Sequence, residues 1–141
     1  MITRRMLTAL AAAITFGDAG GPTRAAAKAV YHLTDLDKVS FVLGNIHNHY
    51  AGTAGEEPAG IALVVHGPAL GAFRKDRADI DLADGLAALL ESGLAPKACI
   101  NTLKAEGIGV ASLLPGFTVA ERGGVVHLAE LQARGYAYIR P

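Results

Sequence analysis

The middle of the chain reads Ile61-Ala62-Leu63-Val64-Val65 and is followed directly by His66-Gly67-Pro68. All five residues of the first segment are apolar, so a strand formed there would bury both of its faces. Strands of this kind are typical of the interior of a parallel sheet that helices cover on both sides. The Gly-Pro pair then favours a turn and ends the strand. The segment therefore predicts the centre of an α/β fold.

Strand-like and helical segments alternate on either side of this centre. Strands are expected at residues 28–33, 94–100, 117–120 and 136–139. Two expected helices have apolar stripes, which comprise Val39, Val42, Leu43, Ile46 and Tyr50, then Leu82, Leu86, Leu89 and Leu90. A third expected helix is marked by Val125, Leu128, Leu131 and Gln132. Because no tight hairpin signal separates the strands, the alternation predicts an α/β parallel sheet with right-handed crossovers.

Length, composition and charge restrict the classes of protein that the chain can belong to. A chain of 141 residues, of which 51% are hydrophobic, suits one domain, expected over residues 28–141. Thirteen basic and thirteen acidic residues balance, and no basic cluster alternates with aromatic residues, so nucleic-acid binding is not expected. The first strand leads into Leu33-Thr34-Asp35-Leu36 instead of a glycine-rich phosphate loop, which argues against dinucleotide binding.

Residues 1–27 are expected to be a cleavable export signal. Arg4 and Arg5 precede an apolar segment at residues 6–16, and Ala25-Ala26-Ala27 offers a site for cleavage. The apolar segment is shorter than the ~20 residues that span a bilayer, so no stable membrane insertion is expected after cleavage. The paired arginines favour the twin-arginine route to the periplasm, and an ordinary general-pathway signal is the alternative.

Cys99 is the single cysteine of the chain and is the main candidate for chemistry. It lies at the end of an expected strand, just before Asn101, which we expect to cap a short helix. Backbone N–H groups and the helix dipole lower the pKa of a thiol in such a place, as a nucleophile or a sulfur carrier requires. In an oxidising compartment, an unpaired cysteine is otherwise buried and inert, or bridged to another molecule.

His66 is expected near Cys99, because ligands of open parallel sheets bind beyond the carboxyl ends of the strands. Its imidazole is either the proton acceptor for the thiol or a structural group at a strand end. One histidine and one cysteine are too few for a closed zinc site, so no metal and no cofactor is expected. The candidate catalytic residues are thus Cys99, His66 and Asn101.

The other histidines are not expected to take part in a site. His47 and His49 point about 200° apart on a helix, since each residue advances by ~100°, so they cannot chelate one ion. His32 and His127 have no partner at a useful spacing and are interpreted as structural. Phe41 lies on the same expected helix as His47 and His49 but faces away from the core, which suggests a contact between subunits.

Six motifs together resemble the DsrE/DsrF-like family, in particular an exported branch of it. They are VYHL at 30–33, LGNIHNH at 43–49, VVHGP at 64–68, ACINTL at 98–103, LLPG at 113–116, and the closing ELQ and GYAYI at 130–132 and 135–139. The resemblance implies a three-layer α/β/α domain with a five-stranded parallel sheet, commonly assembled into trimers or hexamers. Some members of that family carry sulfur as a persulfide on a cysteine.

These observations lead to three hypotheses about function, and none settles whether the protein is an enzyme. The first is an exported sulfur-handling protein, a sulfane-sulfur carrier or a sulfurtransferase subunit, in which Cys99 accepts sulfur from a donor protein and passes it to an acceptor. His66 and Asn101 would polarise or orient the transferred group. The alternative is a non-catalytic periplasmic protein that binds a small ligand or a soft metal through Cys99 and His66, or a structural oligomeric partner of an exported enzyme.

Overall fold

The computed structural model describes residues 25–56 and 60–141, in which five parallel strands form one sheet. The strands are β1 (Ala29–Leu33), β2 (Ile61–Val65), β3 (Ala95–Cys99), β4 (Thr118–Ala120) and β5 (Ala137–Ile139). Their order across the sheet is β4-β3-β2-β1-β5, with β2 at the centre. The expected all-parallel α/β sheet is therefore confirmed. The expected export signal lies outside the described residues as far as residue 24.

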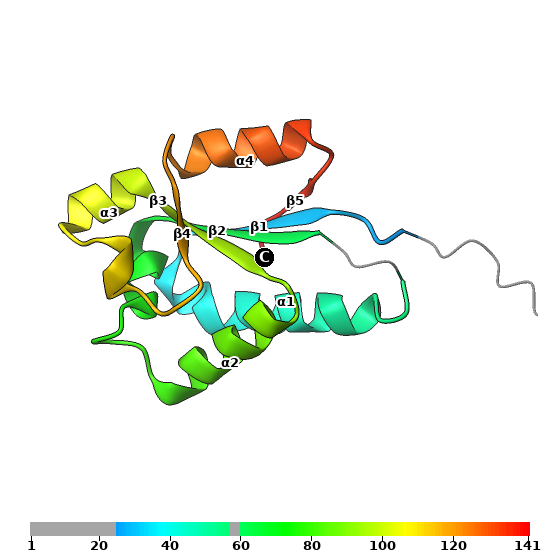
Figure 1. The fold of residues 1–141 in the computed structure, drawn as a ribbon, viewed down its shortest axis with the longest axis horizontal. Coiled ribbons are helices and arrows are strands. Elements are labelled where there is room, and N and C mark those ends of the chain that lie inside the picture. The colour runs from blue at the N-terminus through cyan, green and yellow to red at the C-terminus, as the bar shows by residue number, and fades with distance from the viewer. Residues whose placement is uncertain (1–24, 57–59) are drawn as a thin grey trace, which may run out of the picture.

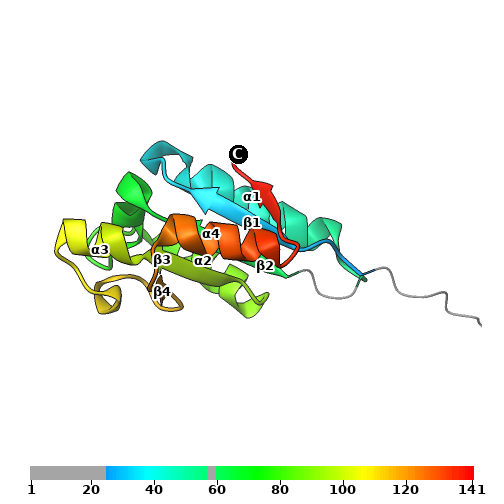
Figure 2. The same cartoon turned by 90° about the horizontal axis from the view of Figure 1, so that it is seen from above.

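Helices cover both faces of the sheet and make a three-layer α/β/α domain (Figures 1 and 2). On one face lie α1 (Val39–Gly52) and α2 (Ile80–Glu91), and on the other lies α4 (Gly124–Ala133). The short α3 (Ile100–Glu106) extends beyond the end of β3. The described part of the chain also contains three short 3-10 turns, at Leu36–Lys38, Gly67–Phe73 and Val110–Ser112. No helix in the described ranges has both the length and the apolar character that a membrane crossing requires.

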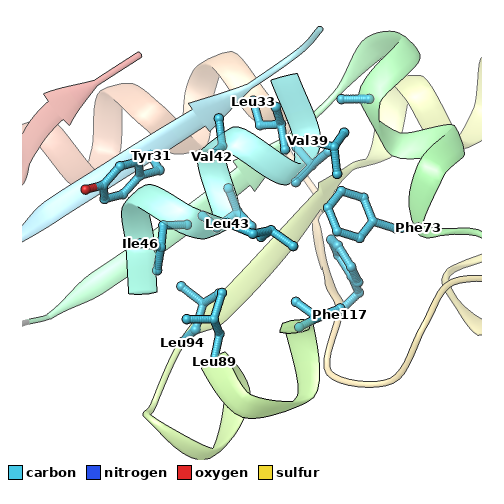
Figure 3. Close-up of a cluster of buried hydrophobic side chains, with 14 of the residues drawn as sticks. Tyr31, Leu33, Val39, Val42, Leu43, Ile46, Phe73, Leu89, Leu94 and Phe117 are labelled. Carbon is cyan, nitrogen blue, oxygen red and sulfur yellow. The ribbon is translucent and has the colours of Figure 1, made fainter. Parts of the chain in front are cut away.

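The two faces of the sheet bury cores of very different size. The larger core lies under α1 and α2, where Phe73 and Phe117 pack edge to face with ring centroids 5.1 Å apart (Figure 3). The expected α1 stripe is buried there at Val39, Val42, Leu43 and Ile46. The smaller core under α4 consists of Val30, Ala62, Val64, Leu128 and Leu131. The smaller core does not extend to the carboxyl ends of the strands on this face, so other side chains occupy that end.

The start of α3 differs from the sequence-based expectation. We expected β3 to run to Ile100 and Asn101 to cap the helix, and both expectations are wrong. Cys99 occupies the N-cap position with extended backbone angles of φ −66° and ψ 124°, and Ile100 is already helical. Asn101 lies exposed in the first turn. The thiol therefore lies at the N-cap itself, two residues before the cap that the sequence suggested.

Candidate functional site

Polar side chains line the carboxyl ends of four neighbouring strands on the face that α4 covers. Tyr138 comes from β5, His32 from β1, His66 from the residue after β2, and Cys99 from β3. These strands are adjacent and parallel in the order β5-β1-β2-β3. Side chains alternate along each strand, so His32 shares the face of Val30, two residues earlier in the smaller core. Residues far apart in sequence therefore form one row across the sheet.

Cys99 and His66 open into a pocket of about 420 Å³ between the starts of α3 and α4. Asn101, Arg122 and Gly124 are among the other residues that line it. The pocket thus contains all three candidate residues predicted from the sequence. The side chain of Arg122 is 75% exposed, so it lies at the mouth of the pocket. There it pairs with the carboxylate of Glu130.

The Cys99 sulfur is buried but is surrounded by donors. The residue is only 4% exposed, and the amide of Gly124 donates a hydrogen bond to Sγ over 3.2 Å. Burial by itself raises the pKa of the thiol, yet the donors outweigh burial, and the pKa lies below its usual value. These donors are the backbone amides of Gly124, Thr102 and Asn101 and the hydroxyl of Thr102. The site therefore favours a thiolate, as expected for a thiol at a helix start.

Thr102 connects the thiol to the turn after β2. Its hydroxyl oxygen accepts a hydrogen bond from the amide of Gly67 over 2.9 Å. Since that contact uses the oxygen as an acceptor, the hydroxyl proton is free to point toward Cys99. Thr102 was not among the predicted site residues, although its place three residues after the cysteine in a short helix was a usable signal.

Gly124 leaves room for His66 and Cys99 to approach the same point. A Cβ atom at position 124 would lie 3.3 Å from Nδ1 of His66, 3.3 Å from Cβ of Cys99 and 3.5 Å from its Sγ. The imidazole therefore presents Nδ1 toward the side of the pocket that holds the sulfur. Gly123, with φ +98°, approaches the amide of Asn101 in a similar way, since its Cβ would lie 3.0 Å from Nδ2.

His66 is not alone, and the expectation that His32 has no partner is wrong. Nε2 of His66 and Nε2 of His32 lie 2.5 Å apart, and Nδ1 of His32 lies 2.6 Å from the hydroxyl of Tyr138. The sequence placed His32 near the carboxyl end of the expected strand at residues 28–33, as its fifth residue. Spacing along the chain does not reveal contacts between neighbouring strands, so this position alone did not predict the contact with His66.

Both imidazoles are held in the neutral form near neutral pH. Burial lowers the pKa of His32 to about 4, assisted by His66 and by Arg140, and opposed by Asp35. Burial, and then Arg140, also lowers the pKa of His66. The guanidinium of Arg140 lies 3.4 Å from the carboxylate of Asp35, so it is fixed beside the pair.

The remaining histidines are distant from the pocket or separately paired. His47 is exposed on α1, and Nδ1 of His49 lies 3.1 Å from the hydroxyl of Tyr31. His127 lies 3.6 Å from the carboxylate of Glu130 on α4. Within residues 25–56 and 60–141, no group of three or more His, Cys, Asp or Glu side chains is arranged to hold a metal ion.

Three solved structures share this fold. A protein of unknown function from Methanobacterium thermoautotrophicum, MTH1491, is 29% identical, with a TM-score of 0.70 over 82% of this chain and 100% of that chain. The ychN protein from E. coli is 15% identical, with a TM-score of 0.60 over 81% and 99% of the two chains. A conserved protein of unknown function from Bacteroides thetaiotaomicron, BT1422, is 18% identical, with a TM-score of 0.59 over 81% and 95%. No protein-family model matches the sequence, and a search of the curated proteins finds no significant match.

Proposed function

We propose that the protein carries sulfane sulfur as a persulfide on Cys99, as the resemblance to the DsrE/DsrF-like family implies. The observation that carries the proposal is the environment of the sulfur. A buried structural cysteine needs only apolar neighbours, whereas Cys99 opens into a pocket and accepts a hydrogen bond from Gly124. Donors of this kind stabilise the anionic form of sulfur, both the thiolate that attacks and the persulfide that forms.

The transfer step is a displacement at sulfur without net oxidation or reduction. The Cys99 thiolate attacks the sulfane sulfur of a donor persulfide, R–S–S⁻, and a new S–S bond forms on Cys99. The S–S bond of the donor breaks, and its electron pair leaves with R–S⁻, which takes up a proton. The same displacement by the thiolate of an acceptor then removes the sulfur and regenerates Cys99.

His66 and Asn101 have separate roles in this proposal. Nδ1 of His66 is the proton acceptor for the thiol, since it faces the same point beside Gly124 as Sγ does. Asn101 and Arg122 line the pocket and carry N–H donors, which suit the anionic leaving group of the donor. Glu106 lies on the same wall and disfavours donors with extended negative charge.

Intact mass measures the carrier function directly. The reduced protein is mixed with a small organic persulfide, and we expect a gain of about 32 Da, one sulfur atom, on the unaltered protein. Cys99→Ser should show no gain, and His47→Gln, an exposed change on α1, should load normally. Addition of a thiol acceptor should then remove the extra mass. A protein that stays at its original mass while its thiol alkylates readily would disprove the proposal.

A soft metal on Cys99 and His66 is the competing function. One observation favours it, because Nδ1 of His66 and Sγ of Cys99 approach the same point, and Cu(I) prefers thiolate and imidazole. Metal analysis of protein purified from the periplasm tests it. One metal ion per chain, lost in both Cys99→Ser and His66→Ala, would favour metal binding over sulfur transfer.

We also propose export to the periplasm and assembly into a homo-oligomer. The paired Arg4 and Arg5 and the alanines at 25–27 support export. Cell fractionation of the full chain, with Arg4→Lys/Arg5→Lys as the comparison, separates the twin-arginine route from the general one. The exposed Phe41, at 57%, supports a subunit contact. A solution mass of one mature chain at micromolar concentration would contradict assembly.

A further inference from the structure

Four side chains at the carboxyl ends of four neighbouring strands lie in a row between the thiol and the surface. Cys99 and Nδ1 of His66 face one point beside Gly124, and the other nitrogen of His66 lies 2.5 Å from Nε2 of His32. The second nitrogen of His32 lies 2.6 Å from the hydroxyl of Tyr138. Tyr138 lies on the edge strand β5 and is 42% exposed, whereas Cys99 is 4% exposed. The row thus runs from the buried sulfur to solvent on the side away from the pocket.

We propose that His32 and Tyr138 act through His66 as a proton relay between solvent and the Cys99 thiol. The proposal rests on the proposed function, because the thiol must lose its proton before it attacks sulfur. Its use follows from the geometry of the pocket. A donor that fills the pocket keeps solvent away from Cys99, and the row through His66 then remains as a path for the proton.

The hydrogen bonds of the row permit a transfer in which no histidine becomes charged. Before transfer, Nδ1 of His66 is free, Nε2–H of His66 donates to His32, and Nδ1–H of His32 donates to Tyr138. The Cys99 proton moves to Nδ1 of His66, the His66 Nε2 proton moves to His32, and the His32 Nδ1 proton moves to Tyr138. Tyr138 releases its own proton to water. The final arrangement keeps the two hydrogen bonds of His32, to His66 and to Tyr138, with both imidazoles in their other tautomer.

The groups around the two imidazoles favour this neutral route. A second proton on the pair would place the N–H groups of His32 and His66 against each other, because their Nε2 atoms lie 2.5 Å apart. Arg140 adds positive charge beside both rings, and Asp35 partly offsets it at His32. These groups disfavour an imidazolium and leave exchange of tautomers as the low-energy path for the proton.

The rate of sulfur loading at different pH values tests the relay. Relative to the unaltered protein, we expect loading at pH 6 to fall about 100-fold in His32→Gln and about 10-fold in Tyr138→Phe, the scale of acid–base catalysis. The deficit should shrink above the pKa of the thiol, because a preformed thiolate needs no proton acceptor. His47→Gln and Tyr136→Phe are the matched controls and should load normally. Equal rates for all proteins at every pH, or a deficit that stays constant with pH, would overturn the relay.

Ring-nitrogen NMR of the unaltered full chain keeps the relay testable if the protein takes up no sulfur. Absence of the mass gain would reject the proposed function alone. In the relay, Tyr138→Phe removes the partner of His32 and shifts the tautomer balance of His66, which Tyr138 does not touch. We therefore expect the ¹⁵N resonances of His66 to move in Tyr138→Phe and to stay in Tyr136→Phe. Unchanged His66 resonances in Tyr138→Phe would overturn the relay independently of sulfur chemistry.

Discussion

The amide of Gly124 donates a hydrogen bond to Sγ of Cys99 over 3.2 Å, which joins the first residue of α4 to the last residue of β3. The two residues are 25 positions apart in the sequence. The contact supplies the thiol with a backbone donor from outside its own helix. Its geometry depends on the absence of a side chain at position 124, because the space there lies between Cys99 and His66.

Gly124→Ala should impair the site without unfolding the protein. The new Cβ would lie 3.3 Å from Nδ1 of His66 and 3.5 Å from Sγ of Cys99, closer to His66 than most contacts allow. We expect the rate of sulfur loading, read by intact mass, to fall about 10-fold or more, since small displacements of reacting groups reduce rates strongly. Gly85→Ala on α2 is the control, because nothing lies within 4 Å of its Cβ. It should stabilise the fold by about 0.5–1 kcal/mol. Normal loading by Gly124→Ala would show that the approach is not needed.

Thr102→Val should raise the pKa of the Cys99 thiol. The change removes a hydroxyl that favours the thiolate and leaves the amide of Gly67 without its 2.9 Å partner. We expect the midpoint of iodoacetamide alkylation against pH to move upward, and the free energy of unfolding to fall by about 1–3 kcal/mol. Thr53→Val removes a comparable hydroxyl contact to the carbonyl of His49, 2.9 Å away on α1. Thr53→Val is the control and should leave the alkylation midpoint unchanged. If Thr102→Val also left it unchanged, Thr102 would have no electrostatic role.

Asn101→Ala should have little effect on stability, because Asn101 is not the cap of α3. Its side chain is exposed, and we expect the free energy of unfolding to change by less than about 0.5 kcal/mol in a urea titration. The comparison is Asp79→Ala, since Asp79 caps α2 by accepting from the amide of Leu82 over 2.8 Å. Loss of that cap should cost about 1 kcal/mol. A similar cost for Asn101→Ala would mean that Asn101 contributes to the helix start after all.

The sequence was sufficient for the fold because each element carried its own signal. The apolar run at Ile61–Val65 became the central strand, and the stripe at Val39 to Ile46 became the buried face of α1. The proximity of Cys99 and His66 could also be predicted, because the carboxyl ends of parallel strands meet at one edge of the sheet. Each of these inferences needs only local pattern and topology.

His32 and Asn101 show where the same reasoning failed. The role of His32 depends on the register between β1 and β2 and on the edge strand β5, which bring three side chains together from positions 32, 66 and 138. No spacing along the chain encodes that register. Asn101 has a strong preference for a cap, yet extended backbone angles continue only to Cys99, so the helix starts one residue before it. Tertiary context therefore placed the cap at Cys99, two residues before Asn101.

Stability should fall as the pH is lowered from about 6.5 toward 4, in part through His32. The pKa of His32 is about 4 in the folded protein against 6.5 for the free side chain. Between these values the unfolded chain binds more protons than the folded one, so protonation favours unfolding as the pH decreases. The groups that face His32 are His66, Tyr138, Arg140 and Asp35. Only Asp35 raises the pKa of His32, and the pKa still lies below its usual value.

We expect the urea midpoint of the unaltered protein to drop over this range, and that of His32→Gln to drop less. His47→Gln, from an exposed site, should follow the unaltered protein. Carboxylates titrate in all three proteins, so the difference between them isolates His32. An identical pH dependence in His32→Gln and His47→Gln would contradict the prediction, and would indicate that His32 is protonated as easily in the folded chain as in the unfolded one.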